Sequence, residues 1–124
     1  MFLATSNKAM GFLHMSYIGR VRASDLRHAH NDVLALLTEL PAGFKLLVDL
    51  GRLESMDTDC VEVIGKIMEI LDRHGLKQVV RVIPDPTKDI GLNILSRFHH
   101  SHNLQITNCK TMSEAVKLLW PDDH

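Results

Sequence analysis

A short apolar stretch near the middle of the chain most constrains the fold. Residues 46–50 are apolar except for Asp49, and such a run is typical of a strand covered on both faces, as in a parallel sheet. After a predicted loop over residues 51–56, apolar side chains recur at helical spacing: Val61, Ile64, Met68 and Leu71. The polar residues just before them, Asp57, Thr58 and Asp59, suit a helix N-cap. The stretch therefore predicts a strand, a loop and a helix start, which is a unit of α/β folds.

The rest of the chain alternates strands and helices in the same way. Further strands are predicted over residues 2–5, 12–21, 78–83 and 104–107. Three further helices follow from apolar stripes with start and stop signals: Ser24 to Leu40, stopped by Pro41 and Gly43; Pro86 to Phe98, behind an Asp85 cap; and the capping box Thr111–Glu114 to Leu119, stopped by Pro121. The central helix is expected to close at His74 and Gly75.

These elements predict one domain over residues 1–124, with the element order ββαβαβαβα. We expect an α/β fold in which a mixed, mostly parallel sheet of four to five strands is packed with four helices. The chain has 124 residues, of which 45% are hydrophobic, so it can build one real core but would be cramped as two domains. Right-handed crossovers should join the parallel strands.

Charge and hydropathy argue against several classes of partner. A formal net charge of -1 gives no reason to expect nucleic-acid binding or a basic membrane-binding face. No apolar run approaches the roughly 20 residues that cross a bilayer, and Met1–Ser6 lacks the features of a signal peptide. We therefore expect a cytoplasmic protein with no membrane partner. Cys60 and Cys109 are too few for a disulfide framework, and both are expected to be reduced and inert.

The central stretch, LLVDLGRLESMDTDC, resembles the signature of STAS domains, the family of bacterial anti-sigma factor antagonists. In that family a buried strand ending in Val-Asp-Leu is followed, at the same spacing, by a loop and by Asp-Ser-Ser-Gly at a helix N-terminus. The order of predicted elements also resembles the family over nearly the whole chain, including Gly19 in the early strand and a valine-rich strand before Pro84. The resemblance implies a single STAS-like domain.

Residue by residue, Asp57 matches the family Asp, Thr58 its first Ser and Asp59 the Ser that is phosphorylated, while Cys60 replaces the Gly. In the family, a kinase that is also an anti-sigma factor binds the unphosphorylated domain, and phosphorylation ends the binding. That switch is not available at Asp59, which carries one negative charge where phosphoserine carries about two. Thr58 is a candidate phosphorylation site, because a helix N-terminus favours phosphate, although Asp57 and Asp59 would oppose the added charge.

The resemblance favours a non-enzymatic regulatory module whose protein partner is similar to an anti-sigma factor or a sensor kinase. We expect the partner to contact residues 54–62, called the corner segment below. Its candidate contact residues are Glu54, Asp57, Thr58, Asp59 and Glu62. Only Arg52 offsets the four acids, so the segment would steer a basic partner. Helix capping alone explains Asp57, Thr58 and Asp59 about as well, since acids at a helix start stabilise it by roughly 0.3–1 kcal/mol each.

Other functions stay open at this point. STAS relatives suggest a carrier that holds a small molecule against the sheet, or a structural subunit of a complex of several such domains, and a homodimer is also open. We expect no metal and no cofactor. His99, His100 and His102 crowd one helix end without carboxylate or Cys ligands at zinc spacing. A nucleophilic Cys60 has acids beside it and no recognisable base, and no glycine-rich phosphate loop follows any strand, so we do not expect an enzyme.

Overall fold

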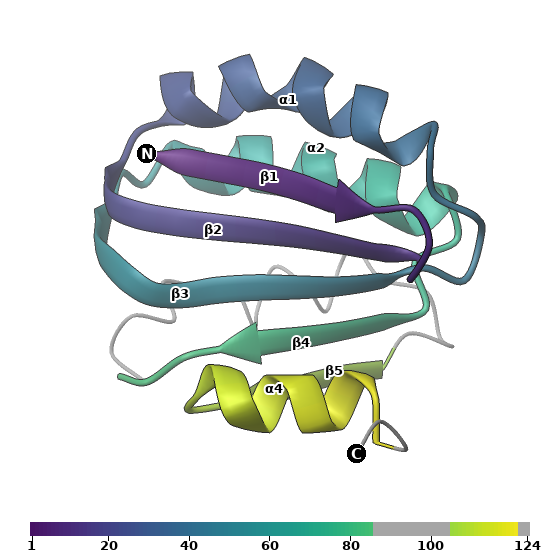
Figure 1. Ribbon diagram of the computed structural model, residues 1–124. Helices are drawn as coiled ribbons and strands as arrows, with labels where there is room; N and C mark the ends of the chain where they lie inside the picture. The colour runs from purple at the N-terminus through teal and green to yellow at the C-terminus, as the bar shows by residue number, and fades with distance from the viewer. Residues whose placement is uncertain (86–104, 122–124) are drawn as a thin grey trace.

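The computed structural model describes residues 1–85 and 105–121, arranged as shown in Figure 1. Its elements are β1 (Phe2–Asn7), β2 (Phe12–Val21), α1 (Ala23–Leu37), β3 (Lys45–Met56), α2 (Cys60–Arg73), β4 (Gln78–Val82), β5 (Gln105–Cys109) and α4 (Met112–Leu119). The strands form one sheet in the order β1-β2-β3-β4-β5, with β1 antiparallel to β2 and the other neighbours parallel. The predicted mixed, mostly parallel sheet is confirmed. Three helices are described, and the helix predicted from Pro86 to Phe98 lies outside the described residues.

Helices cover both faces of the sheet, as the apolar run in β3 predicts. α1 and α2 pack against each other on one face, and α4 lies on the other face, against β3, β4 and β5 (Figure 1). Alternate side chains of β3 point to opposite faces of the sheet. Leu46 and Val48 join the large hydrophobic cluster beneath α1 and α2, and Leu47 joins the smaller cluster beneath α4. β3 is therefore held from both sides in its first half, whereas the buried residues of its C-terminal half, Leu50, Leu53 and Met56, all join the large cluster.

β3 is longer than predicted. The sequence predicts a loop over residues 51–56, but β3 continues through them to Met56, so the Val-Asp-Leu triplet lies inside the strand. The ten residues of β2 pair alongside, with register shifts after Asp49 and after Leu53 that insert extra residues of β3. Bulges of this kind interrupt the alternation of inward and outward side chains. Buried side chains therefore come every third residue, at Leu50, Leu53 and Met56, and the period-two signal of a strand is lost.

Both ends of α1 differ from the prediction, since the helix ends at Leu37 and not at Leu40. This helix begins at Ala23, so Ser24 lies in its first turn and is not the N-cap. The Asp25 carboxylate instead accepts a hydrogen bond from the Arg22 N–H at 2.9 Å. The predicted closure of α2 is confirmed, because Gly75 has a φ of +99°, in the left-handed region that favours glycine.

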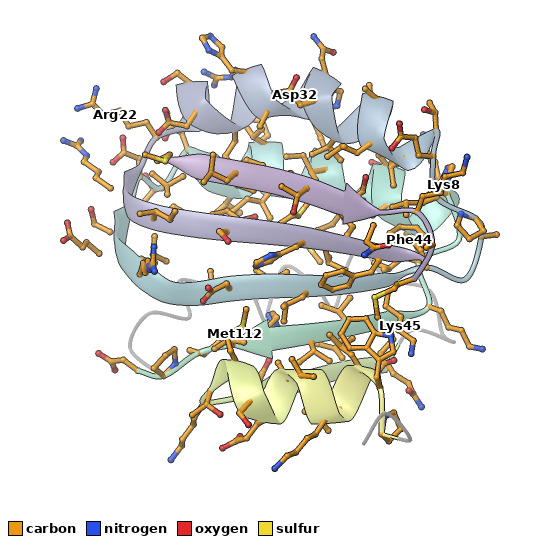
Figure 2. The ribbon with its side chains drawn as sticks, in the orientation of Figure 1. Lys8, Arg22, Asp32, Phe44, Lys45 and Met112 are labelled. Carbon is orange, nitrogen blue, oxygen red and sulfur yellow. The ribbon has the colours of Figure 1, made fainter. Side chains whose placement is uncertain are left out.

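α4 is held to the sheet at its C-terminal end. The Trp120 ring meets Phe12 edge-on, with ring centroids 5.0 Å apart. The Lys45 ammonium lies 5.8 Å from the centre of the Trp120 ring and donates to the Leu119 carbonyl (Figure 2). Trp120 therefore pins the last helix against the sheet. Among the described helices, none has the length and the apolar character needed to span a lipid bilayer.

Candidate functional site

The corner segment lies where β3 ends and α2 begins, and it is fastened to β2. The Asp57 N–H donates to the Val21 carbonyl at 3.1 Å, and the buried Cys60 thiol donates to the same carbonyl at 3.5 Å. The turn also closes on itself, through the Cys60 N–H to the Asp57 carbonyl at 3.0 Å and the Val61 N–H to the Thr58 carbonyl at 3.3 Å. The residues between β3 and α2 are therefore presented on a backbone that the sheet holds in place.

Thr58 and Asp59 face solvent and do not help to hold the helix. Both residues are exposed, and neither side chain makes a hydrogen bond or an ion pair within the described residues. Asp59 occupies the N-cap position of α2, but its backbone is helical, with φ −71° and ψ −10°, and its side chain accepts no hydrogen bond from the helix. Side-chain caps normally have an extended backbone. The prediction that Asp59 caps the helix is therefore wrong, and its carboxylate is available for another contact.

Asp57 is neutralised by a residue from β2. Arg20 places its Nε and Nη2 atoms each 3.3 Å from Asp57 Oδ1. An exposed ion pair of this kind contributes within about 1 kcal/mol to stability. The expectation that Arg52 alone offsets the acids is wrong. Arg20 lies 37 positions before Asp57 and reaches it because β2 pairs with β3 through Arg20 and Ser55, a register that the sequence does not reveal.

The other acids of the corner segment differ in their surroundings. Glu62 is exposed and lies 3.7 Å from Lys66, one helical turn further along α2. Glu54 is exposed on β3, at the second register shift, and not in a loop. The start of α2 therefore brings Thr58, Asp59 and Glu62 into one turn, while Glu54 is presented from the sheet.

Val61 is a candidate contact residue that the sequence pattern assigns to the wrong side of the helix. Of the predicted apolar stripe, α2 buries Ile64 and Leu71, but it buries Cys60 and Val63 in place of Val61, which is 38% exposed. The sequence of this segment contains two overlapping apolar stripes that are offset by one residue. Only the packing of the helix shows which stripe is buried. An exposed valine beside Asp59 and Glu62 gives the surface an apolar centre with a charged rim, as in many protein interfaces.

Cys60 and His74 make contacts that hold the fold. Burial raises the pKa of the Cys60 thiol, and Asp59 and Asp57 raise it further, which makes the thiol a poor nucleophile. His74 is half-buried, with its Nε2 atom 2.9 Å from the Leu40 carbonyl oxygen. The described residues contain no group of three or more His, Cys, Asp or Glu placed to hold a metal ion. The predictions for His99, His100 and His102 lie outside the described residues.

Among the comparisons with known proteins, the comparison with solved structures is the one that gives matches. No family model matches the sequence, and no curated protein matches it. An uncharacterised protein of the DUF3478 family from Shewanella loihica PV-4, with a SpoIIAA-like fold, is 11% identical with a TM-score of 0.71, over 96% of this chain and 92% of that one. SpoIIAA, a Bacillus cell fate determinant, is 14% identical in its phosphorylated form with a TM-score of 0.64, over 96% of this chain and 99% of that one.

A third match is the complex of the diguanylate cyclase SiaD with its activator SiaC from Pseudomonas aeruginosa. It is 14% identical with a TM-score of 0.56, over 88% of this chain and 93% of that chain. These likenesses show that the protein has the SpoIIAA-like α/β fold of STAS domains, as the resemblance of its central stretch predicts. At such low identities they show the fold and not the activity.

Proposed function

We propose that this protein is a non-enzymatic regulatory module that binds a protein partner through the corner segment. The observation that supports this most is the start of α2, where Thr58, Asp59 and Val61 are exposed. Within the described residues, neither the Thr58 nor the Asp59 side chain makes a hydrogen bond or an ion pair that holds the helix. A backbone fixed by the sheet loses little conformational entropy when a partner binds its side chains.

The structural neighbours support the proposal that the partner is a protein. SpoIIAA is named an anti-sigma factor antagonist, and SiaC is named an activator and is found in complex with the cyclase SiaD. These neighbours act on different proteins, so the surface decides the partner and the fold does not. Here the surface offers the Asp59 carboxylate without a partner among the described residues. We propose that the partner resembles an anti-sigma factor or a sensor kinase and contacts this surface with lysine or arginine.

Asp59 bears on how the binding would be regulated. It stands where the STAS signature has the phosphorylated Ser, and it carries a permanent single charge in place of a switchable charge of about two. We propose that regulation at this position is fixed. The exposed Thr58 hydroxyl remains a candidate phosphorylation site, and Arg20 offsets one of the two acids that would oppose a phosphate there. Intact-mass analysis of protein from its native cells tests this, and a chain that is unmodified under all growth conditions would remove Thr58 from the proposal.

Charge reversal tests the binding surface. We expect the double variant Asp59→Lys/Glu62→Lys, used as bait in an extract of the native cells, to retain at least tenfold less partner than the wild type, by quantitative mass spectrometry. The loss corresponds to about 1.4 kcal/mol of binding free energy. The matched control is Asp32→Lys/Glu39→Lys, which makes the same charge change at two exposed positions in and after α1 (Figure 2). Equal retention of the partner by the two double variants would contradict the proposal.

A further inference from the structure

β1 is an edge strand that lacks the usual protection against pairing. Figure 1 shows it as the outermost strand, and its one ladder among the described residues is with β2. Edge strands normally carry lysine, another charge or proline, which blocks the addition of a further strand. The six residues of β1, FLATSN, contain none of these. Its side chains therefore leave the outer edge open to another strand.

The register with β2 shows which backbone groups point outward. Met1 and Ile18 exchange two hydrogen bonds, N to O in each direction, both at 2.8 Å. In an antiparallel pair, residues alternate between exchanging hydrogen bonds and not exchanging them. Leu3, Thr5 and Asn7 therefore bond to β2. Phe2, Ala4 and Ser6 direct their N–H and C=O groups away from the sheet, and these groups form no hydrogen bond to other described residues.

We propose that a second copy of this chain pairs with this edge, β1 against β1, antiparallel about a two-fold axis at Ala4. An antiparallel edge suits its own copy because a two-fold axis matches each donor with an acceptor. Centring the axis on Ala4 places Phe2 opposite the partner's Ser6 and uses all three outward-pointing residues. It also places a small side chain at the axis and joins the two sheets into one continuous sheet.

The side chains on the face away from α1 fit the same register. Leu3 is 51% exposed and lies beside Thr5, and pairing would set Leu3 opposite the partner's Thr5. Phe2–Asn7 carry no charged side chain, so the paired residues themselves would not repel each other, and of the two cations that flank the strand, the Met1 ammonium lies 3.8 Å from Asp25 and Lys8 follows Asn7. A six-residue strand spans about 20 Å, so the interface would be at the small end of specific interfaces, with dissociation in the micromolar range.

A cysteine pair tests the register. Leu3 and the partner's Thr5 would form a non-hydrogen-bonded pair, whose Cα atoms lie about 4.5 Å apart, within reach of a disulfide. We expect a mixture of Leu3→Cys and Thr5→Cys chains to form a covalent dimer under mild oxidation, read on a non-reducing gel. Either variant alone should stay monomeric on the gel, because the native Cys60 and Cys109 are buried. No dimer in the mixture, or equal dimer in all three samples, would overturn the proposed pairing.

Sedimentation velocity tests the association itself without any added cysteine. Between about 5 and 500 µM the wild type should shift from monomer to dimer, and Leu3→Lys should remain monomeric with an unchanged circular dichroism spectrum. Val116→Lys is the matched control, since Val116 is 44% exposed on α4, and it should dimerise like the wild type. A wild type that is monomeric throughout, or a dimer that Leu3→Lys leaves intact, would exclude β1 as the interface. Either result leaves the proposed role of the corner segment on α2 unaffected.

Discussion

The first turns of α2 and α4 are built in different ways, although both follow a parallel strand of the same sheet. At α4 the polar side chains hold the helix: the Thr111 hydroxyl accepts from the Glu114 N–H at 3.1 Å, and the Glu114 carboxylate accepts from the Lys110 N–H at 3.3 Å. At α2 no side chain caps the helix, and buried residues and backbone contacts hold it. The difference teaches that polar residues at a helix start need not cap the helix, and that those at α2 are left available for the binding proposed above.

The largest expected effect is the loss of the buried anchor at the start of α2. Ile64 is 2% exposed beneath the first turns of the helix, so Ile64→Ala should lower the free energy of unfolding by about 2–5 kcal/mol through the cavity it leaves. Urea denaturation measures this. Val61→Ala, at a position 38% exposed, is the control and should stay within about 0.5 kcal/mol. If the two variants lost similar stability, burial would not be what holds this helix start.

A smaller effect is expected at the cap of α4. Thr111→Ala removes the acceptor for the Glu114 N–H and should cost about 1 kcal/mol in urea denaturation. Ser113→Ala is a fitting control, because Ser113 lies exposed in the same first turn and is not the cap. A loss as large for Ser113→Ala as for Thr111→Ala would mean that the side-chain cap is not what stabilises α4.

A buried thiol is the first residue of α2, Cys60, and another, Cys109, ends β5 shortly before α4, and both predict the same pH dependence of stability. Burial raises the pKa of Cys60 and of Cys109, and neighbouring acids add to it: Asp59 and Asp57 at the first, Glu114 at the second. An unfolded thiol has a pKa of about 8.5, so as the pH rises past this value the unfolded chain releases its protons first, and stability falls. Below this pH the contribution is fully present.

Urea denaturation at pH 7.5 and pH 9.5 tests that sign. The wild type should be less stable at the higher pH, and Cys60→Ala/Cys109→Ala should show a flatter dependence from a lower starting stability. An identical pH slope in the double variant would show that the thiols do not ionise differently in the folded and unfolded chains.

The smallest effect on stability is expected at Asp59. Its carboxylate makes no capping bond, so Asp59→Ala should change the free energy of unfolding by no more than about 0.5 kcal/mol, the part that the helix dipole supplies. The same variant should weaken partner binding. A loss near 1 kcal/mol, equal to that of Thr111→Ala, would remove the distinction between the two helix starts.

Much of this architecture is readable from the sequence, because local patterns dominate it. β2 spans the residues predicted for it, the Thr111 cap forms, and Gly75 closes α2. The second half of β3 is not readable, since two bulges give its buried residues a spacing of three, which does not match the period of two of a regular strand.

The candidate site is predicted less completely than the fold. The location of Thr58 and Asp59 at a helix start follows from local sequence, and the structure agrees. The sequence does not show that the Thr58 and Asp59 side chains leave the helix uncapped, because this depends on the backbone conformation of Asp59. The approach of Arg20 to Asp57 depends on strand register over 37 positions, and a single sequence carries no such long-range information.

The attachment of the turn before α2 to the Val21 carbonyl has a consequence for how this protein could diversify. The atoms that set the turn belong to the backbone and to the buried Cys60, whereas Thr58, Asp59 and Val61 are displayed. Selection on affinity and selection on folding would therefore act on separate positions. A lineage could exchange one client protein for another by a few surface substitutions, without first acquiring compensating changes in its interior.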